Sequence, residues 1–211
     1  MSDWSNPYHF TTYPEDIFIE PFDNSNNWTL ATQNGSGSIS EVTNGMLRLY
    51  SDGTQHWANA RCSWQFNSIP TIGWEVQVTI DCPINQDYHN DSYIYDITSN
   101  YYVGFVYKRW SSGYAGLWVS TSTSGSYFPS GYAQVPIPNL PEQIRIKIVY
   151  DANNLITVYW KPIADSDWTF ACTKPLNMPA DSVMYVILSE WDYGTQWTYF
   201  DDLYIRAHHV S

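Results

Sequence analysis

The sequence is poor in charge, in cysteine and in long apolar runs, and each shortage excludes a class of protein. Only 14% of the 211 residues are charged, whereas disordered chains are rich in charge and poor in aromatic residues. The three cysteines allow at most one disulfide, so the chain is not a disulfide-stapled scaffold. No apolar run approaches the roughly 20 residues of a membrane-spanning helix. We therefore expect a protein that folds around an ordinary hydrophobic core.

Basic residues are especially scarce. Nine Lys and Arg stand against 21 Asp and Glu, which gives a net charge of -12. Such a surface repels phosphate backbones and anionic lipid headgroups, because affinity for both depends on Lys and Arg. We expect neither a nucleic acid nor a membrane as a partner. Residues 1–10 contain neither a basic nor an apolar segment, so no cleavable signal peptide is expected either.

Helical periodicity is also absent, and period-two alternation takes its place. In residues 74–80 the positions of Trp74, Val76, Val78 and Ile80 share one face of a predicted strand. A hairpin is predicted where residues 151–154 join two alternating segments. About a dozen short strands predict an all-β protein, a two-sheet antiparallel β-sandwich. We expect residues 1–211 to form one domain, with 1–14 as an N-terminal extension. An immunoglobulin-like sandwich is the alternative, at about half this length.

Four segments carry a resemblance to a known family. They are Glu-Pro-Phe-Asp at 20–23 followed by Trp28, Asn-Gly and a strand at 44–49, the hairpin at 144–160, and Phe-Asp-Asp-Leu-Tyr-Ile at 200–205. Their order resembles the concanavalin A-like lectin/glucanase superfamily, which includes the laminin G-like modules. The resemblance implies a jelly roll whose first and last strands pair. It implies less about function, because one fold hosts many functions.

Hydrolysis of a glycan would require a pair of carboxylates. The β-glucan hydrolases of this superfamily resemble one another in a Glu-x-Asp-x-x-Glu strand, which supplies a nucleophile and an acid about 5–5.5 Å apart. The nearest match here begins at Glu190, and Thr195 stands in the place of the second essential carboxylate. We therefore assign no catalytic residue. A glycosidase that pairs Glu75 with Glu190, and a polysaccharide lyase that uses His56 with Arg109, remain alternatives.

Aromatic residues make up 18% of the chain and are the main functional clue. Several rings are expected in loops, among them Trp57, Trp110, Tyr114, Trp191 and Trp197. Exposed rings beside polar side chains suit neutral sugars, whose C–H faces stack while their hydroxyls form hydrogen bonds. The alternative is that these rings cover the open ends of the sandwich or pack against copies of the protein.

The predicted ligand-binding residues come from three segments. Glu190 and Asp192 would accept sugar hydroxyl protons, and strand alternation places Trp191 and Tyr193 on the opposite side. The stacking ring would then come from another segment if the carboxylates face the ligand. The predicted set is Gln55, His56, Trp57, Arg109, Trp110, Glu190, Trp191, Asp192, Tyr193 and Trp197.

The leading hypothesis is a non-catalytic, lectin-like domain that recognises a neutral glycan. The alternative is a structural or assembly protein of a virion, tail fibre or surface layer, which would form a homo-oligomer or a larger assembly. Both hypotheses favour an extracellular, cell-surface or virion location. No cofactor is required, although calcium would suit oxygen ligands in either of two segments. The first contains Asp87, Asn90 and Asp91, and the second contains Asp23, Asn24 and Asn26 near Asp201 and Asp202.

Overall fold

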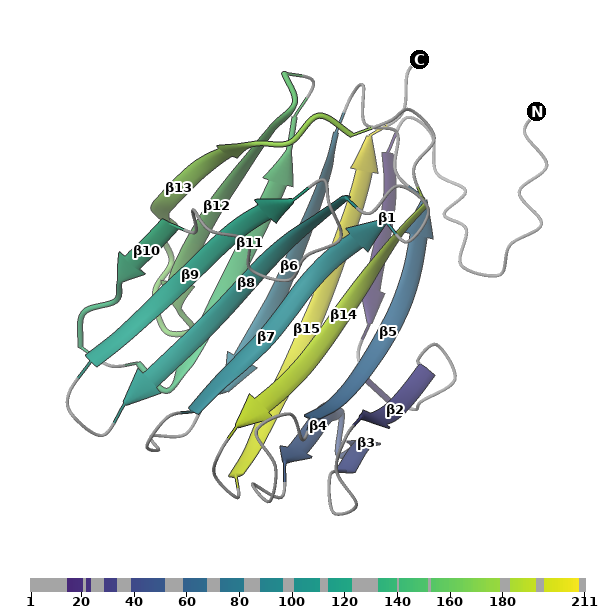
Figure 1. Ribbon diagram of the computed structural model, residues 1–211, viewed down its shortest axis with the longest axis vertical. Helices are drawn as coiled ribbons and strands as arrows, with labels where there is room; N and C mark the ends of the chain where they lie inside the picture. The colour runs from purple at the N-terminus through teal and green to yellow at the C-terminus, as the bar shows by residue number, and fades with distance from the viewer. Residues whose placement is uncertain are drawn as a thin grey trace.

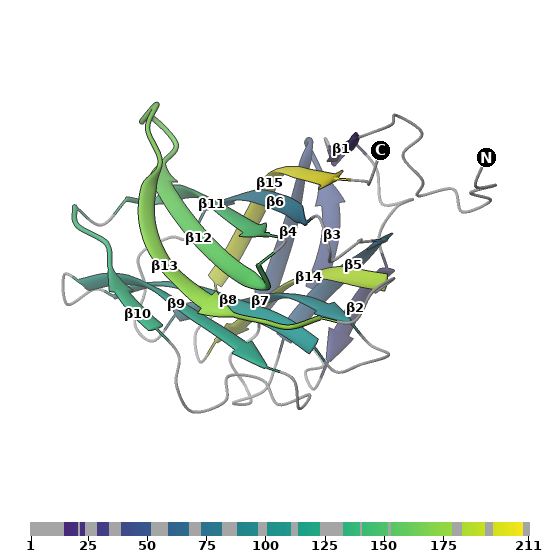
Figure 2. The same ribbon diagram turned by 90° about the horizontal axis from the view of Figure 1, so that it is seen from above.

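The chain folds into two stacked β-sheets, which Figure 1 shows face-on and Figure 2 from above. The computed structural model contains 15 strands and, within the residues that it describes, no helix. Accordingly, no helix of the described part is long and apolar enough to cross a membrane. The described residues are 15–20, 22–23, 29–33, 39–51, 59–67, 73–81, 88–96, 101–110, 114–122, 133–139, 141–151, 153–178, 183–192 and 196–208.

The strands follow one another with short connections. They are β1 Glu15–Glu20, β2 Thr29–Gln33, β3 Ile39–Thr43, β4 Met46–Ser51, β5 Asn59–Asn67, β6 Trp74–Asp81, β7 Tyr88–Asp96, β8 Tyr101–Trp110, β9 Tyr114–Ser122, β10 Ala133–Pro136, β11 Gln143–Tyr150, β12 Leu155–Pro162, β13 Thr169–Pro175, β14 Val183–Asp192 and β15 Gln196–His208.

The strands form two sheets that we call sheet A and sheet B. Sheet A has the order β13-β12-β11-β6-β15-β4-β3, and β1 pairs with the second half of β15. Sheet B has the order β10-β9-β8-β7-β14-β5-β2. The predicted two-sheet antiparallel sandwich is therefore confirmed. The expected pairing of the first and last strands is confirmed as well, because Phe18 of β1 lies opposite Ile205 of β15.

The core lies between the two sheets and follows the predicted alternation. On β6 the side chains of Trp74, Val76, Val78 and Ile80 are all buried. They pack in one cluster with apolar residues of β4, β8, β11, β12, β14 and β15. Each large apolar side chain that is removed from water contributes about 1.5–3 kcal/mol.

A bulge in β15 sets the phase of the closing strand. Opposite β6 the register shifts between Asp201 and Tyr204, so two residues of β15 face one residue of β6. Asp202 takes the left-handed conformation at this point, with φ 50°. Phe200 before the bulge and Leu203 after it are both fully buried. The bulge thus returns the apolar residues to the core and leaves Asp202 exposed.

Sheet B is buried on both faces around β8 and β9. Val103 and Phe105 of β8 belong to the core cluster between the sheets. The alternate residues Tyr102 and Val106 are just as buried, although they are not members of that cluster. Trp118 of β9, which pairs with Val106, is also buried. A strand that is buried on both faces reads as a continuous apolar run, as residues 102–107 do.

Strand β7 shows where a sequence-based expectation is wrong. Asn90 and Asp91, which were expected in a calcium-binding loop, lie inside β7 and pair with Tyr107 and Val106 of β8. Asp87, the third residue of that loop, lies outside the described residues. Asn and Asp favour turns locally. Here pairing with β8 overrides that preference.

The expected loop positions of several aromatic residues are also wrong. Trp110 is the last residue of β8 and Tyr114 the first of β9, where the two residues pair with each other. Trp191 lies in β14 and Trp197 in β15. Aromatic residues have a high strand propensity. The strands here extend to include them instead of ending before them. Trp57, Tyr127, Phe128 and Tyr193, the other rings expected in loops, lie outside the described residues.

Candidate functional site

The backbones of several sequence-predicted residues gather at one end of the sandwich, the lower end in Figure 1. Trp191 of β14 pairs with His89 of β7, and His89 pairs in turn with Lys108 of β8. Arg109 and Trp110 follow Lys108 at the end of β8. Only β7 separates β8 from β14, so their backbones are about 10 Å apart at this row. The pairing thus places two segments that are distant in the sequence at the same end of the strands of sheet B.

The two connecting segments of the predicted site start and end beside each other. Segment 52–58 joins β4 to β5, and segment 193–195 joins β14 to β15. Beside these segments, Ser51 pairs with Gln196 in sheet A, and Asn59 pairs with Trp191, the next-to-last residue of β14, in sheet B. The predicted residues Gln55, His56, Trp57 and Tyr193 themselves lie outside the described residues.

The register gives each predicted residue of β14 a defined position. Glu190 pairs with Ala60 and Asp192 with Tyr88. Positions 190 and 192 continue the phase of Val186, a core residue, and position 191 has the opposite phase. We use the name strand-end site for the ends of β8 and β14 in sheet B, which carry Arg109, Trp110, Glu190, Trp191 and Asp192.

Trp197 occupies a different place from the strand-end site. It lies on β15 in sheet A, where it pairs with Tyr50 of β4. The two rings are 5.0 Å apart, and the guanidinium of Arg48 lies 4.4 Å from the centroid of the Trp197 ring. Arg48 also forms an ion pair with Glu41 of β3. The described contacts of Trp197 are therefore with the β3–β4 edge of sheet A.

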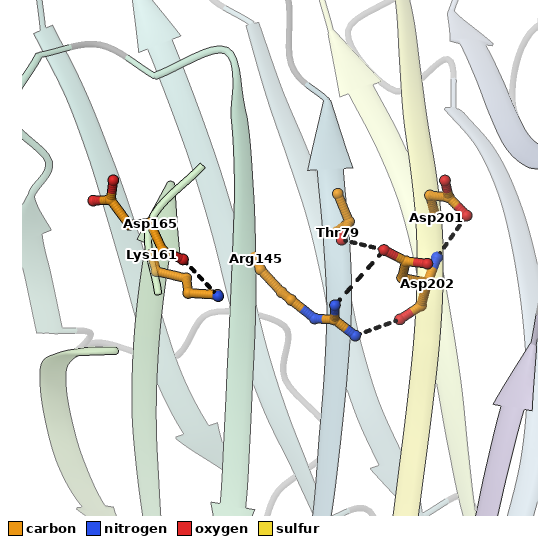
Figure 3. Close-up of polar contacts among 6 residues, drawn as sticks. All are labelled: Thr79, Arg145, Lys161, Asp165, Asp201 and Asp202. Carbon is orange, nitrogen blue, oxygen red and sulfur yellow. Dashed lines mark hydrogen bonds and ion pairs between the residues drawn. The ribbon is translucent and has the colours of Figure 1, made fainter. Parts of the chain in front are cut away.

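A polar row crosses sheet A at the bulge of β15, as Figure 3 shows. Arg145 of β11 pairs with Thr79 of β6, which pairs with Asp201 of β15. The guanidinium of Arg145 reaches over β6, with one nitrogen 3.6 Å from the carboxylate of Asp202 and another donating to its carbonyl oxygen at 3.3 Å. The hydroxyl of Thr79 lies 3.5 Å from the same carboxylate. The row connects three strands across the bulge.

Asp201 is the acid of this row whose pKa is shifted. Partial burial raises the pKa of its carboxyl above the usual value. The backbone N–H of Asp202, which donates to Asp201 Oδ1 at 2.7 Å, and the charge of Arg145 both oppose that rise, while the charge of Asp202 adds to it. The two adjacent carboxylates thus differ in environment. Asp201 carries the cost of burial, and Asp202 is exposed and paired with Arg145.

Asp201 and Asp202 are not well suited to the expected calcium ion. The oxygen that a cation would use on Asp202 already faces the Arg145 guanidinium, and a second positive charge there would be repelled. Asp23, from the same predicted segment, is exposed, and Asn24 and Asn26 are not described. Among the described residues no three His, Cys, Asp or Glu side chains form a group that could hold a metal ion.

The two glutamates considered for hydrolysis lie in different sheets. Glu75 is on β6 of sheet A, where it pairs with Val149 and Arg206 and accepts a hydrogen bond from Gln77. Glu190 is on β14 of sheet B. A retaining pair needs two carboxylates about 5–5.5 Å apart on one cleft. The two strand positions do not lie on a common sheet face, so the structure gives no support to this pair.

A pocket that the sequence does not predict lies where the free edges of the two sheets approach each other. Its volume is about 450 Å³, within the range of small-ligand sites. We call it the proline pocket. It is lined by Val135, Pro136, Pro138, Asn139, Pro141, Trp160, Pro162, Asp165, Thr169 and Phe170. These residues come from the end of β10, the following turn, β12, the β12–β13 turn and the start of β13.

Trp160 lines this pocket and also carries a buried donor without a partner. Its side chain is only 5% exposed, and its indole Nε1–H has no hydrogen-bond partner among the described residues. A buried polar group without a partner costs about 1–3 kcal/mol. In the sequence, Trp160 is simply the last apolar residue of an alternating strand. The run of prolines at 136, 138 and 141 was the available signal, but it indicates a turn and not a pocket.

The fold has the two-sheet jelly-roll arrangement of the concanavalin A-like lectins, as the four sequence segments suggested. A similar structure is the CBM2 module of the evolved Dit of Lactobacillus casei BL23 phage J-1, with a TM-score of 0.67 at 10% identity over 94% of this chain and 98% of that chain. Lectin II from Ulex europaeus has a TM-score of 0.62 at 9% identity, covering 92% and 98%. Lectin I-B4 from Griffonia simplicifolia, in a metal-free form, has a TM-score of 0.59 at 11% identity, covering 92% and 99%.

These similarities concern the fold alone, because the identities are near 10%. No protein-family model matches the chain, and no curated protein sequence matches it significantly. The likeness to these proteins is therefore one of strand arrangement. What the chain binds has to be argued from its own residues.

Proposed function

We propose that this chain is a non-catalytic carbohydrate-binding domain that recognises a neutral glycan. One observation supports the proposal: β-pairing brings the ends of β14 and β8, whose residues include carboxylate and aromatic types suited to sugars, to one end of the sandwich. The fold of two lectins and of a phage CBM2 module adds support at the level of architecture. The net charge of -12 favours a neutral ligand over an acidic one.

The division of labour follows from the chemistry of the side chains. In this proposal Glu190 and Asp192 accept hydrogen bonds from sugar hydroxyls, and charged acceptors form the stronger hydrogen bonds of this kind. The stacking ring comes from Trp57 or Trp110 if the two carboxylates face the ligand. Trp191 has the opposite strand phase, in the same row as His89 and Lys108. It serves as the platform if the ligand lies on that face.

A glycan array followed by calorimetry tests the proposal. An array of neutral and acidic glycans should give a neutral ligand, and Asp192→Asn should weaken its binding by about 1–3 kcal/mol, the cost of losing a charged hydrogen bond. Glu142→Gln is the matched control, because Glu142 is an exposed acid outside the strand-end site. Full affinity of Asp192→Asn, with Trp191→Ala merely destabilising the fold, would place this segment in the core and refute the proposed site.

Turnover of the ligand distinguishes binding from hydrolysis. Incubating the chain with the oligosaccharide found on the array should release no new reducing ends, because no pair of carboxylates for a retaining mechanism is proposed. Release of reducing ends that Asp192→Asn abolishes would identify a glycosidase and contradict a purely binding role.

A role in an assembly is the second candidate function, and the similarity to a module of a phage protein favours it. Glycan binding and assembly are compatible, because a module of a particle can carry both. Size-exclusion chromatography with light scattering distinguishes an isolated domain from an assembly component by its oligomeric state. A monomer supports an isolated binding domain, and a trimer or a larger ring supports an assembly component. An assembly component of this kind would lie on a virion or a cell surface, as the sequence-based hypotheses expect.

A further inference from the structure

The proline pocket is the feature that the strand-end site does not explain. It lies on the same row of sheet B but at the far edge. Pro136 of β10 pairs with Gly116 of β9, which pairs with Lys108, and the row continues through β7 to Trp191. Four strand spacings separate Pro136 from Trp191, which is about 19 Å. The pocket is therefore a separate place at the same end of the sandwich.

Proline rings form much of the wall of this pocket. Four prolines line it, at positions 136, 138, 141 and 162. A proline ring fixes φ and offers no N–H, so such a wall is already ordered before a ligand arrives. A pre-organised wall loses little conformational entropy on binding.

An exposed ring stands at the rim. Phe170 is 58% exposed, which is unusual for so large an apolar side chain, and its described ring contact is an edge contact with Tyr159 at 6.1 Å. A ligand with an apolar face would cover the free side of Phe170 and remove that surface from water.

The polar side chain that the pocket offers to a ligand is the carboxylate of Asp165, an exposed residue of the lining. The main chain of Asp165 is already used, since its carbonyl accepts from Lys161 Nζ at 2.7 Å and its N–H donates to the carbonyl of Pro162 at 3.1 Å. Figure 3 shows the carboxylate turned away from that lysine.

We propose that the proline pocket binds one neutral pyranose ring, as a second sugar subsite beside the strand-end site. The inference rests on the proposed function, because it assumes that the ligand is a glycan. A pyranose has an apolar C–H face for Phe170, and its hydroxyls can donate to the carboxylate of Asp165. A proline-rich peptide matches the apolar walls, but it lacks the N–H donors that the carboxylate needs. An acidic sugar would be repelled by Asp165 and by the net charge.

The indole N–H signal of Trp160 reports directly on this pocket. The chain labelled with ¹⁵N is titrated with the methyl glycosides of glucose, galactose, mannose and N-acetylglucosamine, after triple-resonance assignment of the indole signals. At least one glycoside should shift the Trp160 signal saturably. Asp165→Asn and Phe170→Ala should each weaken that binding at least about tenfold. Asp167→Asn should leave it unchanged, because Asp167 is an exposed acid two residues away that does not line the pocket.

The possible outcomes separate this inference from the proposed function. If glycosides shift signals of the strand-end site and never that of Trp160, the subsite is refuted and the proposed function stands. If a decaproline peptide shifts the Trp160 signal and no glycoside does, the pocket is a peptide site and the inference is wrong. If neither the glycosides nor the glycans of the array bind anywhere, both proposals fail. Asp165 and Phe170 are exposed, so these variants test the pocket without disturbing the core.

Discussion

Arg145 reaches across β6 to Asp202 and contacts both its carboxylate and its carbonyl oxygen, and the Asp202 that it holds has a left-handed backbone. The bulge at Asp202 decides which later residues of β15 return to the core, Leu203 first among them. The Asp202 side chain of this ion pair is 55% exposed, so the pair contributes little, typically under about 1 kcal/mol. The conformation of residue 202 therefore matters more than its charge.

Substitutions at Asp202 should separate these two contributions. Asp202→Val places a β-branched residue at φ 50°, which should lower the free energy of unfolding by about 2 kcal/mol or more. Asp202→Gly removes the same ion pair but suits the left-handed conformation, so it should change stability by less than about 1 kcal/mol. Urea unfolding of both variants measures the difference. Equal losses in the two variants would show that the charge pair, and not the bulge, is what matters.

Asp201 should make stability depend on pH. Because burial raises the pKa of Asp201 above 3.8, the folded chain holds this proton more tightly than the unfolded chain does. The stability that protonated Asp201 contributes is therefore lost as the pH rises from 3.8 through the raised pKa. Asp201→Asn should raise the Tm at pH 7 by a few degrees at most, since the side chain is partly exposed.

The comparison at low pH checks the cause of this effect. Below pH 3.8 the carboxyl of residue 201 is mostly protonated in both the folded and the unfolded chain. Asp201→Asn and the unmodified chain should therefore differ least in stability there. Asn keeps the Oδ1 atom that accepts from the N–H of Asp202. Thermal melts at pH 7 and at pH 3.5 measure both differences. A lower Tm of the variant at pH 7 would contradict the prediction, because attraction to Arg145 would then outweigh burial.

Strands with one buried face are the part of the fold that local pattern predicts well. The alternation of Trp74, Val76, Val78 and Ile80 is visible in the sequence, because one face of β6 is in the core and the other is more exposed. The two-residue turn of Asn44 and Gly45, both with positive φ, is equally local. The local pattern does not predict β7, because pairing with β8 outweighs the turn preference of residues such as Asn90.

The candidate sites depend on information that a local pattern does not contain. The sequence indicates the chemistry of Glu190, Trp191 and Asp192, but only the pairing of Trp191 with His89 places them beside β8. The proline pocket is even harder to predict from the sequence, because residues near 136 and residues near 165 meet only where two sheet edges converge. Propensity indicates turns at both places and nothing about the space between them.

Gly73 should tolerate no side chain. Its φ is +100°, and a Cβ there would lie 2.1 Å from the carbonyl oxygen of Tyr150, in the strand next to β6. Gly73→Ala should therefore lower the free energy of unfolding by more than about 2 kcal/mol, from backbone strain and steric overlap together. Gly45→Ala is the comparison, because Gly45 also has a positive φ but lies in a two-residue turn. Urea unfolding should show the larger loss for Gly73→Ala, and a smaller one would refute the close approach.

Trp197 should prove to be a residue of stability and not of glycan binding. Its ring contacts Tyr50 and the guanidinium of Arg48, both on β4, and no described contact links it to β8 or β14. An aromatic pair and a cation–π contact are together worth about 1–2.5 kcal/mol, so Trp197→Ala should lower the free energy of unfolding by about that amount. Trp197→Phe should recover part of the loss, because it keeps a ring against Tyr50. Calorimetry with the neutral glycan found on the array should give unchanged affinity for both variants. If Trp197→Ala kept full stability and lost affinity, Trp197 would instead be the stacking platform that the sequence first suggested.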